Sequence, residues 1–243
     1  MDRSSTAANR QSRNRLLEAL PPEDYRRLES ELTPVPLPQH MVLETPDRPT
    51  DRVYFPWDGV CSFTASMKDG STVEVATIGN EGVVGMSVYF GGQVPSVETV
   101  VQVPGDGATM MRAGTFTAEM ERRGPLYHLV RRYSQALLTL MTQSVACNAL
   151  HDIDKRCARW LLMTHDRVGG DTLQLTQEYL ATMLGVRRPT VTLVAKRLQA
   201  SGLIQYRRGR IVVRDRAGLA RLSCECYGVV NGIYDRLLPR SAG

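Results

Sequence analysis

Short β-type runs fill the chain between residues 35 and 111, where valine, threonine and aromatic residues are frequent and glycine and proline separate the runs. Two of these runs flank Asp69 and Gly70, a dipeptide typical of two-residue hairpin turns. Several short strands at this spacing predict an antiparallel barrel or roll. The runs cover residues 53–55, 60–67, 72–78 and 97–103.

Helical spacing begins at Pro125 and continues to about His151. Apolar and small residues recur there at intervals of four and three, the heptad spacing of a coiled coil. Other apolar residues lie off this seam, so the helix has two apolar sides, one for its own domain and one for a second copy. We therefore expect a parallel homodimer, with a core helix in a monomer as the alternative. The seam assigned to the dimer interface consists of Leu126, Val130, Tyr133, Leu137, Leu140, Ser144 and Cys147.

A helix-turn-helix followed by a hairpin is predicted after a further helix over 153–168. Thr176 is placed to cap a helix over 177–184, and Gly185 ends that helix where the turn needs a positive φ. The next helix, 188–199, is expected to start with Arg188 as its cap and Pro189 in its first turn. Runs over 203–206 and 211–213 then form the hairpin, or wing.

Charge separates the two halves of the chain. Residues 1–152 contain 14 basic and 18 acidic residues, whereas residues 153–243 contain 16 and 7. The segment 187–210 has seven basic residues and no acid, which favours a polyanionic partner such as double-stranded DNA. Arg188 is the first candidate for reading guanine, and Lys196 and Arg197 for holding phosphate. The full predicted DNA-binding set is Thr176, Gln177, Arg187, Arg188, Thr190, Thr192, Lys196, Arg197, Arg207, Arg208 and Arg210.

Chemistry other than DNA binding has little support in the chain. No Gly-x-Ser-x-Gly, Walker or His-Glu-x-x-His motif occurs, so we do not expect an enzyme. Cys147 and His151 have a spacing that suits a metal, but two ligands do not make a site, and we expect no metal and no cofactor. Cys224 and Cys226 could be redox-active, but buried or idle thiols are the interpretation we favour. The N-terminus has no apolar h-region and the chain has no run of eighteen or more apolar residues, so we expect a cytoplasmic protein without a membrane anchor. In such a protein the five cysteines are expected to be reduced thiols.

With these residues in view, the chain resembles the Crp/Fnr family of bacterial transcription regulators over about residues 16–225. The resemblance is most specific over 175–213, where Leu175-Thr176-Gln177-Glu178-Tyr179-Leu180 begins the helix-turn-helix and Arg188 stands at the position of the family's guanine-reading arginine. Thr190 and Lys196 also match the family. Pro189 replaces a glutamate that reads cytosine in many members, and Leu193 replaces another base-reading arginine, so a different half-site is expected.

The resemblance implies an α+β fold: an N-terminal antiparallel β jelly-roll of the cyclic-nucleotide-binding type as sensor, a long dimerisation helix and a C-terminal winged helix-turn-helix. It implies a homodimer on a near-palindromic operator, with RNA polymerase as a further partner. We expect a disordered tail over 1–14, the sensor over 15–124, the dimerisation helix over 125–152, the DNA-binding domain over 153–225 and a C-terminal helix or tail over 226–243.

The expected effector pocket departs from the family pattern. Gly85 and Met86 align with a Gly-Glu pair that binds ribose, and Pro95 and Ser96 with an Arg-Ser pair that binds the cyclic phosphate. An anionic phosphate buried without a guanidinium loses a charge-assisted pair of about 1.5–3 kcal/mol, so cyclic AMP is not the expected effector. The alternative function is a ligand- or protein-binding module with a vestigial DNA-binding domain.

Overall fold

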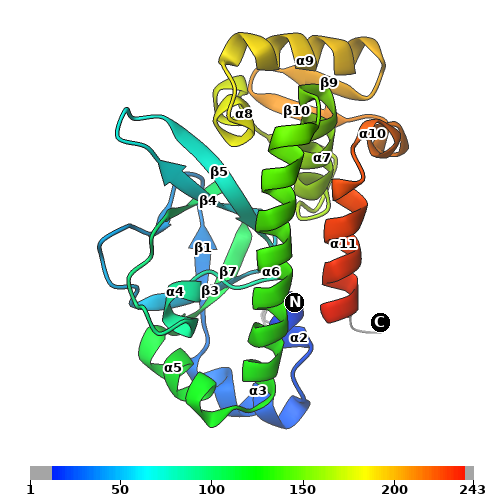
Figure 1. Cartoon of the computed structure of the whole chain (residues 1–243). Helices are drawn as coiled ribbons and strands as arrows, with labels where there is room; N and C mark the ends of the chain where they lie inside the picture. The colour runs from blue at the N-terminus through cyan, green and yellow to red at the C-terminus, as the bar shows by residue number, and fades with distance from the viewer. Residues whose placement is uncertain (1–12, 239–243) are drawn as a thin grey trace, which may run out of the picture.

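The computed structural model describes residues 13–238. Figure 1 shows a β domain and a helix-turn-helix domain, with the long helix α6 (Pro125–Leu150) running beside both. This arrangement confirms the predicted fold class. None of the helices between Arg13 and Leu238 has the length and hydropathy needed to span a bilayer.

The β domain consists of two antiparallel sheets with strand orders β1-β7-β3 and β2-β6-β4-β5. Side chains between the sheets, among them Phe55, Ile78 and Met111, are fully buried, so this domain has its own apolar core. The predicted roll is therefore confirmed. The strands are β1 (Thr33–Leu37), β2 (Val42–Glu44), β3 (Arg52–Pro56), β4 (Val60–Ser66), β5 (Thr72–Ile78), β6 (Glu98–Val103) and β7 (Gly105–Arg112).

Short helices close the β domain at its ends. They are α2 (Arg15–Glu18), α3 (Pro22–Leu28), the 3₁₀ turn η1 (Glu29–Glu31), α4 (Met86–Tyr89) and α5 (Ala113–Arg122). Asn14 caps α2 and is fully buried, and its amide nitrogen donates to the carbonyls of Pro56 (3.0 Å) and Gly82 (2.8 Å). The predicted tail over 1–14 is thus wrong at its end, because Asn14 belongs to the core. Residues 1–12 lie outside the described part of the chain.

The C-terminal domain is built around a second apolar core. It contains α7 (Ile153–His165), α8 (Gln177–Leu184), α9 (Arg188–Ala200) and α10 (Arg216–Leu222). A three-stranded sheet in the order β8-β10-β9 completes it, formed by β8 (Thr172–Gln174), β10 (Arg210–Val213) and β9 (Ile204–Arg207). Trp160, Leu161, Leu180, Val191 and Ile211 lie in its core, each at most 4% exposed.

Helix α11 (Cys226–Leu237) leaves this domain and packs alongside α6 (Figure 1). Its buried residues Val230, Ile233 and Tyr234 join the core of the β domain. Helix α6 is therefore covered by the β domain and by α11 of the same chain.

This packing corrects the predicted dimer interface. Each of the seven seam residues is at most 9% exposed within the single chain, so the seam is the intramolecular side of α6 and does not face a second copy. Heptad spacing predicted a buried stripe correctly but assigned it to the wrong partner, because α11 supplies a cover that the spacing does not encode. The residues concerned are Leu126, Val130, Tyr133, Leu137, Leu140, Ser144 and Cys147.

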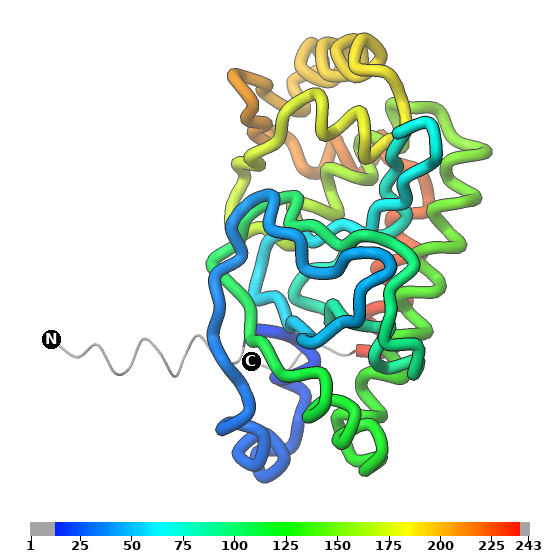
Figure 2. The backbone as a smooth tube through the Cα atoms, turned by 90° about the vertical axis from the view of Figure 1, so that its left-hand side faces the viewer, coloured from blue at the N-terminus to red at the C-terminus, as the bar shows by residue number. Residues whose placement is uncertain are grey.

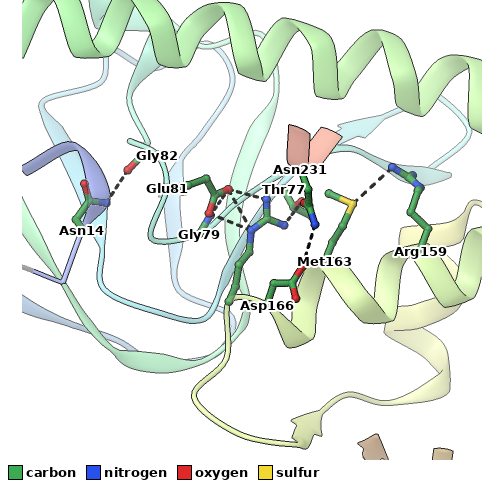
Figure 3. A network of polar contacts seen from close by, with 10 residues as sticks. Asn14, Thr77, Gly79, Glu81, Gly82, Arg159, Met163, Asp166 and Asn231 are labelled. Carbon is green, nitrogen blue, oxygen red and sulfur yellow. Dashed lines mark hydrogen bonds and ion pairs between the residues drawn. The ribbon is translucent and has the colours of Figure 1, made fainter. Parts of the chain in front are cut away.

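A buried ion pair joins the two domains. Arg167, in the loop after α7, lies with Nη2 2.6 Å from Oε1 of Glu81, and both side chains are 6% exposed. Its Nη1 donates to Oγ1 of Thr77 at 2.7 Å, and its carbonyl accepts from the backbone N–H of Gly59 at 2.9 Å. A Cβ on Gly79 would lie 2.5 Å from Cδ of Arg167, so only glycine allows this approach. Figure 3 shows Glu81 with Gly79 and Thr77 in this network.

Burial acts to raise the pKa of Glu81, but the charge of Arg167 outweighs it and holds the pKa of that carboxyl below its usual value. The pair is therefore ionised, and each charge depends on the other.

We expect Glu81→Ala to lower the free energy of unfolding by about 3–5 kcal/mol, because it leaves the Arg167 guanidinium buried without its counter-charge. Urea unfolding monitored by tryptophan fluorescence measures this, since Trp57 reports on the β domain and Trp160 on the C-terminal domain. The exposed pair Arg13–Asp106 provides the control: Asp106→Ala should cost at most about 1 kcal/mol. Equal losses for the two variants would contradict the role given to Glu81.

Candidate nucleic-acid interface

The helix-turn-helix is formed by α8 and α9, which pack against each other. Gly185 ends α8 with φ +62°, as the sequence predicted, and its N–H donates to the carbonyl of Thr182 at 3.1 Å. The N–H of Val186 donates to the carbonyl of Ala181 at 3.0 Å. The small Ala181 and the left-handed glycine thus set the angle at which α9 leaves the turn.

The start of α9 differs by one residue from the prediction. Arg187, with extended backbone angles, is the cap, and Arg188 is the first helical residue, followed by Pro189. Pro189 disfavours helical geometry at Arg188 but does not forbid it. The helix α9 therefore begins one residue earlier than predicted, with Arg187 as its cap. Arg188 is consequently held by the helix and exposed at its leading end.

The basic side chains differ in whether they already have a partner. Arg197 makes a bidentate pair with Asp154 of α7, with distances of 2.8 and 2.9 Å from Nη2 to the two carboxylate oxygens. Arg188 lies near Glu178 of α8, with Nε 3.7 Å from the carboxylate, and both side chains remain about two-thirds exposed or more. Within residues 13–238, the other five basic residues of the acid-free run form no ion pair. They are Arg187, Lys196, Arg207, Arg208 and Arg210, all exposed.

The four uncharged residues of the predicted set lie within the helix-turn-helix itself. The Thr176 hydroxyl caps α8 by accepting from the N–H of Tyr179 at 3.3 Å. The Thr192 hydroxyl donates to the side-chain oxygen of Gln177 at 2.7 Å and so ties α9 to the start of α8. Thr190 is partly buried in the first turn of α9. Thr176, Gln177 and Thr192 thus stabilise the helix-turn-helix whose surface carries the basic residues without ion-pair partners.

The wing carries three of the free cations. Strands β9 and β10 are paired through Arg207 and Arg210, and the turn between them, Arg208-Gly209, has φ values of +48° and +76°. Two successive positive φ values are typical of the tight turn that suits paired strands. Figure 1 places α9 and this hairpin at the same end of the molecule, away from α3. The structure thus brings the cations of α9 and of the wing together at one end of the molecule.

Three contacts connect this end of the molecule to the β domain. The hairpin β4–β5 reaches α8 (Figure 2), where Cγ2 of Val73 would lie 3.2 Å from a Cβ on Gly185. The Trp160 indole donates to Glu74 at 2.7 Å, and the Tyr179 hydroxyl lies 3.1 Å from Nδ1 of His40. Burial raises the pKa of Glu74 to about 7, against the lowering effect of its hydrogen bonds from Ser62 and Trp160. These contacts join the β domain directly to α7 and α8.

The residues expected to form an effector pocket are dispersed between core and surface. Gly85, with φ +110°, precedes α4, and Met86 is only 4% exposed within the core of the β domain. Pro95 is buried, whereas Ser96 is exposed.

Beside α4, the chain places a carboxylate of its own. Glu44 is 5% exposed and accepts hydrogen bonds from the hydroxyls of Thr50 (3.1 Å), Ser87 of α4 (3.1 Å) and Thr99 (2.8 Å). These three hydroxyls therefore already donate to a side chain of the protein itself. The sequence analysis missed Glu44, because its three partners come from three separate segments of the chain.

Comparisons with known proteins agree with this geometry. Residues 155–222 match the Crp-like helix-turn-helix domain family. A comparison with curated proteins found no match.

Among solved structures, FixK2 of Bradyrhizobium japonicum is similar with a TM-score of 0.67 and 16% identity, over 79% of this chain and 98% of that one. A putative transcriptional regulator of the Crp/Fnr family from Eubacterium rectale gives a TM-score of 0.64 and 16% identity, over 85% and 96%. The c-di-GMP-responsive global regulator CLP of Xanthomonas campestris gives 0.60 and 19%, over 78% and 97%.

The fold consists of two domains, a cyclic-nucleotide-binding-like β domain and a winged helix-turn-helix. Residues 155–222 thus belong to the Crp-like helix-turn-helix domain family, and the chain as a whole shares the fold of these solved regulators.

Proposed function

We propose that the protein is a transcription regulator of the Crp/Fnr type. It binds a near-palindromic operator in cytoplasmic DNA as a homodimer, with one α9 of each protomer in successive major grooves about 34 Å apart. The observation that carries this is the set of five exposed cations without acidic partners on α9 and the wing. Arg188 is the proposed base reader, because a guanidinium at the start of the helix can pair with guanine O6 and N7. Contact with RNA polymerase belongs to the same proposal.

The face of α6 left open by the chain supports the dimer. Its exposed residues recur at intervals of three and four, and the series includes Leu138 (61% exposed) and Val145 (71% exposed). Large apolar side chains at this exposure favour an intermolecular contact. The groove beside them, with a volume of about 1280 Å³, is lined by Leu138 and by Phe90, which is 70% exposed. The stripe consists of His128, Arg131, Gln135, Leu138, Thr142, Val145 and Ala149.

Control by cyclic AMP is not part of the proposal. A cyclic phosphate beside α4 would meet the buried carboxylate of Glu44, and like charges repel strongly where water is excluded. Neither Met86 nor Pro95 offers a compensating charge.

Isothermal titration calorimetry of the purified protein with cyclic AMP is expected to show no heat of binding. The reason is the Glu44 carboxylate together with the missing guanidinium. A micromolar dissociation constant would contradict the proposal.

DNA binding should be steep in salt and selective through Arg188. Five free cations per chain predict that log K falls against log salt with a slope of about −4.5 per protomer, or about −9 for the dimer. Arg188→Ala should cost about 1–3 kcal/mol on the best site and relax selectivity. Arg207→Ala should weaken binding uniformly and reduce the slope by about 0.9 per protomer.

Arg197→Ala is the matched control, since Asp154 already compensates its charge and the slope should hardly change. Gel-shift titrations over a range of salt, on sites selected from random duplexes, measure all three variants. Indifference of the native protein to DNA would instead favour a ligand- or protein-binding module with a vestigial DNA-binding domain.

The open stripe of α6 can be tested separately. Replacing both Leu138 and Val145 by Asp should convert the dimer to a monomer, because it puts charge into an apolar contact. Val229→Asp is the control, since Val229 is 45% exposed on α11, outside the stripe. Sedimentation equilibrium gives the mass directly. A native protein with the mass of one chain, or a double variant that stays dimeric, would refute this interface.

A further inference from the structure

Three cysteines and one histidine from distant segments meet where α6, α10 and α11 converge. Cys147 and His151 lie at the end of α6, and Cys224 and Cys226 lie at the start of α11. Their ligand atoms all lie within 4.8 Å of one another. The cysteines are at most 5% exposed. Sequence spacing alone offers Cys147 and His151, and the fold adds the other two.

The distances fit a tetrahedral metal ion. Zinc bonds of about 2.3 Å to sulfur and about 2.0–2.1 Å to nitrogen place tetrahedral ligands about 3.5–3.8 Å apart. Sγ of Cys147 and Sγ of Cys224 are 3.6 Å apart, and Sγ of Cys226 lies 3.5 Å from Nδ1 of His151. Two of the six donor–donor separations thus match the edges of a coordination tetrahedron, and the other four are at most 4.8 Å.

Ordinary apolar packing does not account for this group. Cys61 and Cys157 are also buried, but each belongs to one of the two large apolar cores. Cys147, Cys224 and Cys226 instead form a small cluster of their own, in contact with one another and with neither of those cores. Three thiols gathered with an imidazole are a typical ligand set for structural zinc.

The surroundings orient the donors as second-sphere groups do in zinc proteins. Nε2 of His151, on the far side of the ring from Cys226, lies 3.3 Å from the carboxylate of Glu225. A carboxylate at that nitrogen fixes the ring and leaves Nδ1 free for a metal. The side-chain nitrogen of Gln143 donates to Sγ of Cys226 at 3.1 Å, which stabilises a thiolate.

We propose that Cys147, His151, Cys224 and Cys226 bind one structural Zn²⁺ per chain. Four protein ligands close the coordination sphere, so the ion holds structure and performs no catalysis. It joins the end of α6 to the start of α11, beside the junction between α6 and α7. The ion therefore fixes the α6–α7 junction, from which the C-terminal domain projects, and it ties the start of α11 to the end of α6.

The first test is the metal content of the full chain, purified without chelators under reducing conditions. Mass spectrometry of the elements should find about one zinc per chain. Replacement of the zinc by Co²⁺ should produce the intense visible ligand-field bands of tetrahedral cobalt and the charge-transfer bands of cobalt–thiolate bonds. A protein that takes up neither ion after reduction and incubation with excess metal overturns the proposal.

Variants locate the site. Cys226→Ser should abolish stoichiometric zinc and the tetrahedral cobalt spectrum. Cys157→Ser should retain both, because Cys157 is buried in the apolar core of the C-terminal domain and lies outside the cysteine cluster. His151→Ala should release zinc to a colorimetric chelator at least tenfold faster than the native protein. Equal metal content in Cys226→Ser and Cys157→Ser would place the metal elsewhere and refute the assignment.

Thiol counting distinguishes the site from a disulfide. In the zinc protein, all five cysteines should react with a thiol reagent after denaturation in a chelator. The melting temperature should fall when zinc is removed and recover when it is restored, because a ligand bound only to the folded state stabilises that state. Recovery of only three free thiols from protein prepared in reductant would show a Cys147–Cys224 disulfide and overturn the proposal.

Discussion

The buried pair of Arg167 and Glu81 determines how the two domains meet. A guanidinium taken out of water is stable only beside a counter-charge, so the loop after α7 has one position on the β domain. Thr77 and the N–H of Gly59 satisfy further polar groups of Arg167, and Gly79 leaves room for its side chain. From this anchor, α7 and the reading helices project toward the hairpin β4–β5, which contacts α8.

Two further contacts extend the same junction. Trp160 donates to Glu74 across the domains, and α11 returns from the DNA-binding domain to the core beside α6. The cluster of Cys147, His151, Cys224 and Cys226 lies where that return begins. The β domain and the helix-turn-helix domain are thus joined by a buried ion pair, by hydrogen bonds and by the packing of α11.

Much of the basic surface on α9 and the wing could be predicted, because the sequence features that indicate it are local. A run without acids, a glycine at the turn and Thr176 before α8 need only neighbouring residues to be recognised. The role of Arg197 could not be predicted, since its partner Asp154 lies in another helix. The predicted start of α9 was wrong by one residue, because a proline at position 189 is compatible with either Arg187 or Arg188 as the cap. Strands β1, β2, β7 and β8 were not among the predicted runs. Prolines interrupt β1, glycines lie at the start of β7, and β2 and β8 have three residues each.

The amino-acid sequence by itself determined the periodicities, the basic segment and the turns, and with them the fold class. Only the tertiary structure decided which neighbour each apolar face meets. The stripe from Leu126 to Cys147 is buried by α11 and the β domain of its own chain, and Leu138 and Val145 are left exposed. The same holds for Glu44 and for the four thiol and imidazole groups. Periodicity records that a side chain is covered, whereas long-range packing chooses what covers it.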